Sequence, residues 1–255
     1  RYGWRATPAG MGSIIASHQP GATEMPSLWK LEVSRDPNKH FVLKEVSQLS
    51  TDAVRREISG KLRAGNSKSL LLFVHGYNSS FADAAFRTAQ MAHDLQFPGV
   101  AFFYTWPSVG TMRGYWQDED TARLCEPVFD LLLDELTKLP VEDIYVVAHS
   151  MGNRIVGHGL QNRIDRNKPN NQIRGLLLAA PDIDADIFKN LIAPKLLSMQ
   201  KTRTTIYAAS SDFALQASKW VHGFQRVGET NGGVLVFPGI ETVDASSASS
   251  PLQNL

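Results

Sequence analysis

The sequence of 255 residues is poor in cysteine, in long apolar runs and in charge of one sign. Its single cysteine, Cys125, excludes an internal disulfide and a cysteine-cluster metal site. No apolar run has the length that spans a bilayer, so we expect no transmembrane segment. The net charge is +1, with acids and bases interspersed. Because no basic stripe offers a phosphate-binding face, nucleic acid is not an expected partner.

Motifs for metal ions and phosphate groups are lacking as well. No two of the 7 histidines have the spacing of a metal-ligand pair, and no glycine-rich phosphate loop occurs. We therefore expect no metal ion and no other cofactor. No histidine follows His222, which limits the choice of a catalytic base near the C-terminus.

What is present is a regular alternation of apolar and amphipathic segments. The predicted strands are 28–33, 41–46, 70–74, 100–105, 144–148, 173–179, 204–208 and 234–237, the last continuing towards 243. The predicted helices are 51–64, 81–95, 121–139, 151–164, 185–197 and 213–221. Buried strands that alternate with amphipathic helices predict an α/β fold, with a mostly parallel sheet and helices on both of its faces.

The rest of the pattern indicates one domain. Residues 1–26 are rich in Gly, Pro, Ala and Ser without a sustained period, and we expect them to form an N-terminal extended arm. Residues 27–255 are expected to form a single domain that is truncated at its C-terminus. Only about twenty residues separate the predicted sixth and seventh strands, so we expect no large cap domain and a fairly open site.

Residues 144–152 place a serine at a sharp strand-to-helix turn. Ile144 to Ala148 form an apolar strand pattern, Ser150 follows between the small residues Ala148 and Gly152, and a helical pattern then begins. Such a turn raises the serine oxygen above the sheet, where a histidine can reach it. Eight strands with this turn after the fifth predict the α/β-hydrolase fold. We therefore predict Ser150 as a nucleophile, although a helix N-cap serine gives the same local pattern.

The tetrahedral intermediate of acyl transfer needs two backbone N–H donors for its oxyanion. The first predicted donor is Met151, at the start of a helix whose dipole adds favourable potential. The second is expected from the loop after the third strand, where Tyr77 is the first choice and Asn78 the second. His75 precedes the nucleophile and lies on the wrong loop for a base, so we expect it to brace the turn.

A carboxylate and a histidine should complete the site. Asp212, after the seventh strand, is the favoured acid, while Asp182 and Asp184, after the sixth, are the alternatives. Each could equally be a helix N-cap. The base is expected in the loop after the last strand. His222 precedes that strand and is the fallback base, but its position also suits a cation near a helix C-terminus.

With these residues, the chain resembles a bacterial family of α/β-hydrolases in the esterase/lipase superfamily, of unknown physiological role. The resemblance covers nearly the whole chain and rests on five motifs, which are His75-Gly76-Tyr77-Asn78, Trp106-Pro107-Ser108, Ala148-His149-Ser150-Met151-Gly152-Asn153-Arg154, Ala180-Pro181-Asp182-Ile183-Asp184 and Ser211-Asp212. It implies Ser150 as nucleophile and Asp212 as acid. It also implies a histidine-bearing segment that follows residues 243–255 and lies beyond this sequence. Because some relatives carry lipoprotein-type leaders, bacterial cytoplasm and cell envelope both stay open.

These features predict a serine carboxylic-ester hydrolase that acts on a small-molecule ester or a lipid through an acyl-enzyme on Ser150. A thioesterase, acyltransferase or peptidase would use the same triad. The alternative is a non-catalytic module of the same fold that binds a lipid or protein partner. The missing histidine after the last strand is its main support. The sequence does not decide the oligomeric state.

Overall fold

The computed structural model describes residues 2–7, 10–16, 41–43, 45–109, 114–168, 170–209, 225–230 and 233–247. The strands within these ranges are β1 (Tyr2–Thr7), β2 (Gly10–Ala16), β3 (Val46–Leu49), β4 (Ser69–Val74), β5 (Val100–Thr105), β6 (Asp143–His149), β7 (Ile173–Ala179), β8 (Arg203–Ala208) and β9 (Glu241–Asp244). The helices are α1 (Thr51–Ala64), α2 (Phe81–Asp94), α3 (Tyr115–Leu136), α4 (Gly152–Asp165), α5 (Ala185–Ile187), the π-helix η2 (Phe188–Ile192) and α6 (Ala193–Ser198).

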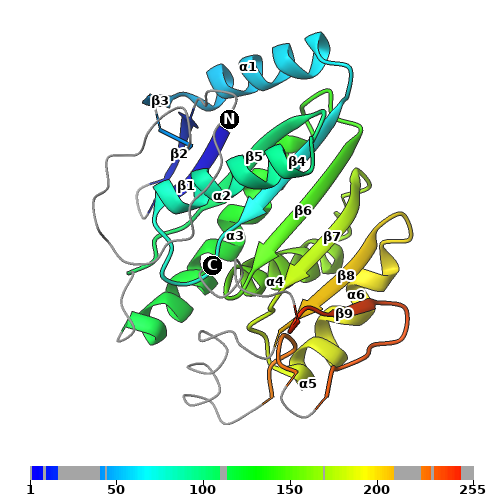
Figure 1. Cartoon of the computed structure of the whole chain (residues 1–255). Coiled ribbons are helices and arrows are strands. Elements are labelled where there is room, and N and C mark those ends of the chain that lie inside the picture. The colour runs from blue at the N-terminus through cyan, green and yellow to red at the C-terminus, as the bar shows by residue number, and fades with distance from the viewer. Residues whose placement is uncertain are drawn as a thin grey trace.

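The strands of the described ranges form one 9-stranded sheet in the order β3-β2-β1-β5-β4-β6-β7-β8-β9 (Figure 1). Neighbouring strands from β1 to β9 in this order are parallel, while β2 is antiparallel to both β1 and β3. The predicted mostly parallel sheet is confirmed. The prediction of eight strands is wrong for the described residues, which form nine.

Helices cover both faces of the sheet, as the sequence predicted. Alternate residues of β4 face opposite ways, since Leu72 and Val74 belong to a large core cluster and Phe73 to a smaller one. The large cluster includes buried residues of α1, α3, α4, η2 and α6. The smaller one packs Phe73 and Phe103 against α2. This two-sided burial explains why the central strands are apolar along their whole length.

The N-terminal part of the sheet differs from the prediction. Residues 2–7 and 10–16 form the hairpin β1–β2, and β1 pairs with β5, in the segment that we expected to be an extended arm. The predicted strand 28–33 lies outside the described residues, and β3 begins at Val46, where the predicted strand 41–46 ended. Pairing with β5 is a long-range contact, and such contacts override a weak local strand pattern.

The parallel strands bring several chain segments to one edge of the sheet. Strands β4, β6, β7 and β8 are consecutive neighbours and run in the same direction. Their carboxyl ends, at Val74, His149, Ala179 and Ala208, therefore share an edge. The loops that carry the predicted site residues begin there. No helix in the described part of the chain is both long enough and apolar enough to cross a membrane.

Candidate active site

Ser150 occupies the turn between β6 and α4, with a φ of +47°. This left-handed conformation is uncommon for a residue with a side chain. The turn is anchored on its neighbours, because the Ser150 N–H donates to the Ala179 carbonyl at 2.9 Å. The buried Asn153 amide also donates to the Ser150 carbonyl at 2.9 Å. The backbone strain at Ser150 is thus held by the end of β7 and the first turn of α4.

Two glycines let the loop after β4 approach the serine turn. A Cβ on Gly152 would lie 2.4 Å from the His75 carbonyl oxygen, so only glycine fits there without a shift. A Cβ on Gly76 would lie 2.8 Å from the Cβ of Ser150. The small residue at 152 was part of the turn pattern noted in the sequence. The approach of Gly76 to Ser150 became visible only in the structure.

The Ser150 hydroxyl is enclosed rather than open. The residue is 1% exposed, and its Oγ has no hydrogen-bond partner among the described residues. We expected a fairly open site, and this expectation is wrong for the hydroxyl itself. The close approach of the Gly76 loop brings that loop against the Ser150 side chain although no large cap is present in the described part of the chain.

The two predicted oxyanion donors flank this turn. Met151 precedes the first residue of α4, and neither its N–H nor that of Tyr77 has an acceptor within the described ranges. The N–H of Asn78 is engaged, because it donates to Ser108 Oγ at 2.9 Å. Of the two alternatives in this loop, Tyr77 therefore keeps its amide available and Asn78 does not.

His75 braces the same loop, as predicted. Its Nδ1 contacts the Gly76 carbonyl at 2.8 Å, and its Nε2 accepts from the Trp106 N–H at 3.1 Å. The Trp106 ring stacks on it at a centroid distance of 5.3 Å, and the indole N–H donates to the His75 carbonyl. Complete burial lowers the pKa of His75 to about 4. The ring is therefore neutral and fully engaged, which suits a structural role rather than that of a base.

Asp182 is completely buried and already paired. Its Oδ2 accepts from the Tyr115 hydroxyl at 2.5 Å and lies 3.4 Å from Arg154 Nη2. Its Oδ1 lies 3.4 Å from Nε of the buried Arg226. Arg154 in turn contacts Glu119 Oε1 at 2.6 Å. Burial opposes the charge of Arg154, yet Asp182, Tyr115 and Glu119 hold the pKa of Arg154 above its ordinary value.

Asp184 caps a helix. Its side chain accepts from the N–H groups of Asp186 at 2.9 Å and Ile187 at 3.0 Å, as the N-cap of α5. The contacts of Asp184 are therefore those of a helix N-cap, which the sequence had left open as one of its two roles. Both alternative acids are engaged in structural hydrogen bonds.

Asp212 and His222, the favoured acid and the fallback base, lie outside the described residues. The described segments on either side of them are anchored near the carboxyl edge of the sheet. The Ala209 N–H, after β8, donates to the Gly228 carbonyl at 3.0 Å, and the Gly228 N–H donates to the Pro181 carbonyl at 3.0 Å. Ala209 and Gly228 are therefore held next to Pro181, in the segment that follows β7.

Tyr115, Glu119 and Arg226 were not predicted from the sequence as members of this network. The signal that could have revealed their network is Arg154, a cation in the first turn of α4. A positive charge there opposes the helix dipole and therefore calls for a carboxylate partner. The identity of the partners could not be inferred, because Tyr115 and Asp182 are 67 residues apart.

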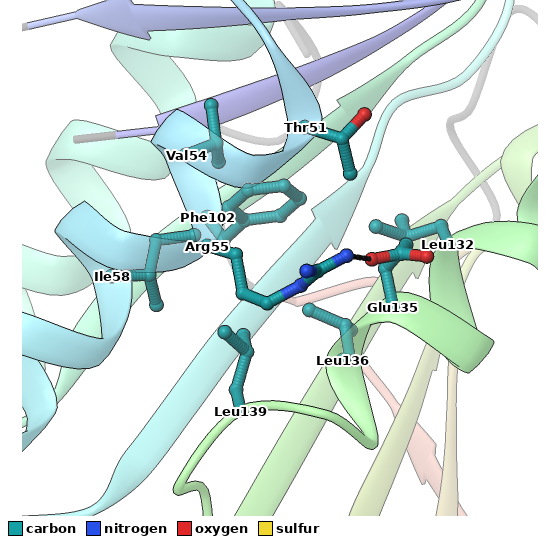
Figure 2. Close-up of a pocket in the computed structure, with 9 residues that line it drawn as sticks. All are labelled: Thr51, Val54, Arg55, Ile58, Phe102, Leu132, Glu135, Leu136 and Leu139. Atoms are coloured by element: carbon teal, nitrogen blue, oxygen red, sulfur yellow. Dashed lines mark hydrogen bonds and ion pairs between the residues drawn. The ribbon is translucent and has the colours of Figure 1, made fainter.

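Neither of two surface cavities of the described chain is lined by Ser150. One is a crevice between α1 and α3, where Arg55 reaches across Phe102 to Glu135 (Figure 2). Its volume of about 20 Å³ leaves room for roughly one water molecule. Within the described ranges, no cluster of three or more His, Cys, Asp or Glu could hold a metal ion.

Comparison with known proteins adds a family match. A family model described as an alpha/beta hydrolase of unknown function (DUF900) matches residues 50–239, which is more than half of the chain. No curated protein sequence matches.

Solved structures of three esterases are similar to the chain. An arylesterase is 11% identical with a TM-score of 0.41, over 74% of this chain and 73% of that one. An esterase from Pyrobaculum calidifontis is 10% identical with a TM-score of 0.39, over 81% and 88%. A fungal esterase from Rhizomucor miehei is 11% identical with a TM-score of 0.37, over 77% and 80%. At these TM-scores the likeness carries no argument about activity.

Proposed function

The chain belongs to the DUF900 family of alpha/beta hydrolases, and from this membership we propose that it is a serine hydrolase of carboxylic esters with Ser150 as nucleophile. The observation that carries the proposal is the turn at Ser150. A non-glycine residue is held at a φ of +47° between a parallel strand and a helix. Strain of this kind persists where the surrounding structure enforces it, and it is common at functional sites.

The proposed reaction proceeds through an acyl-enzyme. A base removes the Ser150 proton while Oγ attacks the ester carbonyl, and the oxyanion that forms accepts hydrogen bonds from the N–H groups of Tyr77 and Met151. Collapse of this intermediate breaks the ester bond, and the leaving alcohol takes the proton from the base. Water, deprotonated by the same base, then attacks the acyl-enzyme and releases the carboxylic acid and Ser150.

Asp212 is the proposed acid. Asp182 and Asp184 are the weaker candidates. The Asp182 carboxylate is paired with Tyr115 and two arginines, and the Asp184 carboxylate caps α5. The proposed base is a histidine, as the family resemblance implies, and His222 is the fallback base within this sequence. The substrate is proposed to be a small-molecule ester or a lipid.

Labelling with a fluorophosphonate and hydrolysis of 4-nitrophenyl butyrate test the proposal. We predict that Ser150→Ala abolishes labelling and lowers turnover by roughly 10⁴-fold, as in known serine triads. Ser59→Ala is the matched control, because Ser59 is also a buried serine but lies on α1. Both assays are run on this chain and on a form extended at its C-terminus, with and without His222→Ala.

The outcomes separate the alternatives. Activity that survives Ser150→Ala contradicts the nucleophile. Absence of labelling and hydrolysis in the extended form favours the non-catalytic module that binds a lipid or protein partner. Loss of turnover on His222→Ala assigns the base to His222, whereas a large gain on C-terminal extension assigns it to the added segment.

A further inference from the structure

Tyr115 lies between the two segments that carry the candidate oxyanion donors. It is 3% exposed and is the first residue of α3. Its ring packs edge-on against the ring of Tyr77, with centroids 5.6 Å apart and planes at 63°. Its hydroxyl accepts from Arg154 Nη2 at 2.9 Å. One side chain thus contacts the Tyr77 loop after β4 and the first turn of α4.

The hydroxyl of Tyr115 also links these segments to the Ser150 turn. It donates to Asp182 Oδ2 at 2.5 Å. The Asp182 N–H donates to the Ser150 carbonyl at 3.3 Å, and the Asp182 carbonyl accepts from Arg154 Nε at 2.7 Å. A closed chain of hydrogen bonds therefore runs from Tyr115 through Asp182 and back through Arg154.

Removal of the Tyr115 hydroxyl would disturb this arrangement more than one lost hydrogen bond suggests. The hydroxyl is at once a donor to a carboxylate and an acceptor from a guanidinium, and all three groups are largely buried. Without it, Asp182 loses a short charge-assisted bond and Arg154 Nη2 loses its shortest contact. Arg154 is then expected to shift towards Asp182. Because Arg154 lies in the first turn of α4, this shift would move the start of that helix.

We propose that Tyr115 is a positioning residue that sets the spacing between the Tyr77 and Met151 N–H groups. Oxyanion donors act when they lie about 2.7–3.1 Å from the developing charge, so small changes in their spacing matter. Tyr77 and Met151 come from different loops, and Tyr115 contacts the side chain of one and the helix that follows the other. The inference rests on the proposed function, because the spacing matters only if an oxyanion forms there.

The first test is kinetic and uses Tyr115→Phe, which keeps the ring against Tyr77 and removes only the hydroxyl. We expect kcat for 4-nitrophenyl butyrate to fall roughly 10- to 100-fold, with KM changed by less than about threefold, because the donors act mainly in the transition state. Tyr104→Phe is the matched control. Tyr104 is a fully buried tyrosine whose hydroxyl donates to the Cys125 carbonyl at 3.1 Å, and its loss should leave kcat within about twofold of wild type.

The second test does not depend on turnover. Hydrogen exchange of the Asn78 and Asn153 amides, which are hydrogen-bonded and lie next to the two donors, should be roughly tenfold faster in Tyr115→Phe than in wild type, because the contacts that hold both segments are weakened. Tyr104→Phe should leave both amides near their wild-type rates. Tyr77→Leu removes the ring contact from the other side and is expected to speed exchange at Asn78, so the test survives if Tyr115→Phe does not fold.

The two tests distinguish the inference from the function beneath it. Unchanged exchange at both amides, or a kcat for Tyr115→Phe equal to that of Tyr104→Phe, overturns the positioning role and leaves the hydrolase proposal intact. A wild-type protein without Ser150-dependent hydrolysis overturns the hydrolase proposal. In that case the exchange rates alone support or overturn the role of Tyr115 in positioning the segments that carry the Tyr77 and Met151 N–H groups.

Discussion

At the scale of single residues, Gly76 is the position where the loop after β4 comes closest to the Ser150 side chain. An added Cβ would lie 2.8 Å from the Cβ of Ser150 and 3.0 Å from the His149 carbonyl oxygen. Real Cβ atoms do not approach so closely, so either the loop or the Ser150 turn must move. The candidate site and the packing around it are therefore coupled at this glycine.

We predict that Gly76→Ala destabilises the protein by about 1–3 kcal/mol, as overpacking in a core does. It should also lower ester turnover, because the shift displaces Tyr77 or Ser150. Urea unfolding and hydrolysis of 4-nitrophenyl butyrate measure the two effects. Gly60→Ala on α1 is the control, since nothing lies within 4 Å of its added Cβ. That variant should gain about 0.5–1 kcal/mol from helix propensity.

Substitution of the three candidate acids by asparagine is predicted to affect turnover and stability differently. Asp212→Asn should cut turnover strongly, because the base loses its orienting acceptor, with little effect on stability. Asp182→Asn should cost about 3 kcal/mol, because Arg154 and Arg226 lose their buried counter-charge. Asp184→Asn should change little, because Asn caps a helix as well as Asp.

Turnover and urea unfolding on the three variants give the comparison. A larger fall in the kcat of Asp182→Asn than of Asp212→Asn, at equal stability, would move the acid to the loop after β7. A stability loss for Asp184→Asn as large as that for Asp182→Asn would contradict the N-cap assignment.

Residue roles were predictable where local chain order decided them. The bracing role of His75 followed from its position before the nucleophile, and the preference for Tyr77 over Asn78 agrees with the engaged amide of Asn78. The pairing of Asp182 was not predictable. Its partners come from α3, α4 and the segment near Arg226, and only the folded chain brings these together.

At the scale of elements, α2 is held at its start by reciprocal capping. Ser80 accepts from the Asp83 N–H at 3.1 Å, and the Asp83 carboxylate accepts from the Ser80 N–H at 2.9 Å. Ser80 ends the segment that follows Tyr77, and Asp83 lies in the first turn of α2. This cap therefore fixes the helix that the candidate oxyanion loop enters.

We predict that Ser80→Ala costs about 1 kcal/mol in the free energy of unfolding, measured in urea, because the Asp83 N–H loses its acceptor at the helix start. Ser80→Thr keeps the cap and should lose only a few tenths of a kcal/mol. Equal losses for the two variants would mean that the capping box contributes nothing.

Elements with strong periodicity were predicted well, and those that depend on distant partners were not. The bounds of α1 agree with the prediction, and α2 and α4 agree within a residue at either end. α3 begins at Tyr115 rather than at 121, and Pro127 lies inside it. β1 and β2 were missed because their stability as strands comes from pairing rather than from an alternating pattern. β1 pairs with β5, and β2 pairs with β1 and β3.

At the scale of the whole molecule, buried titratable groups predict how stability depends on pH. Burial lowers the pKa of His75 to about 4 and also lowers that of His158. Between about pH 6.5 and 4, the unfolded chain binds more protons at His75 than the folded chain does, so stability falls as the pH falls. The contribution is fully present above the unfolded pKa and amounts to roughly 3 kcal/mol for His75. Burial raises the pKa of Glu126 to about 7, and this group acts in the opposite direction over the same window.

We predict that His75→Gln flattens the loss of stability between pH 7 and pH 4.5, although the variant is less stable than wild type at every pH. Glu126→Gln should make the same loss steeper, because the opposing contribution is gone. Urea unfolding at several pH values measures the slopes. A His75→Gln slope equal to that of wild type would mean that this ring is protonated in the folded state.

Because the Ser150 hydroxyl is enclosed, its observed reaction rate depends on two quantities, the intrinsic rate of the chemical step and the fraction of molecules in which the hydroxyl is accessible. At 1% exposure, a reagent meets the oxygen only in molecules whose surrounding side chains have moved apart. The observed rate is then the intrinsic rate multiplied by the accessible fraction, which is about one tenth for an opening free energy of about 1.4 kcal/mol. Compact esters need the smallest opening and should react first. A substitution that loosens the packing around Ser150 would admit larger esters but would also misalign the oxyanion donors. Such a variant would accept a wider range of substrates and react more slowly with each.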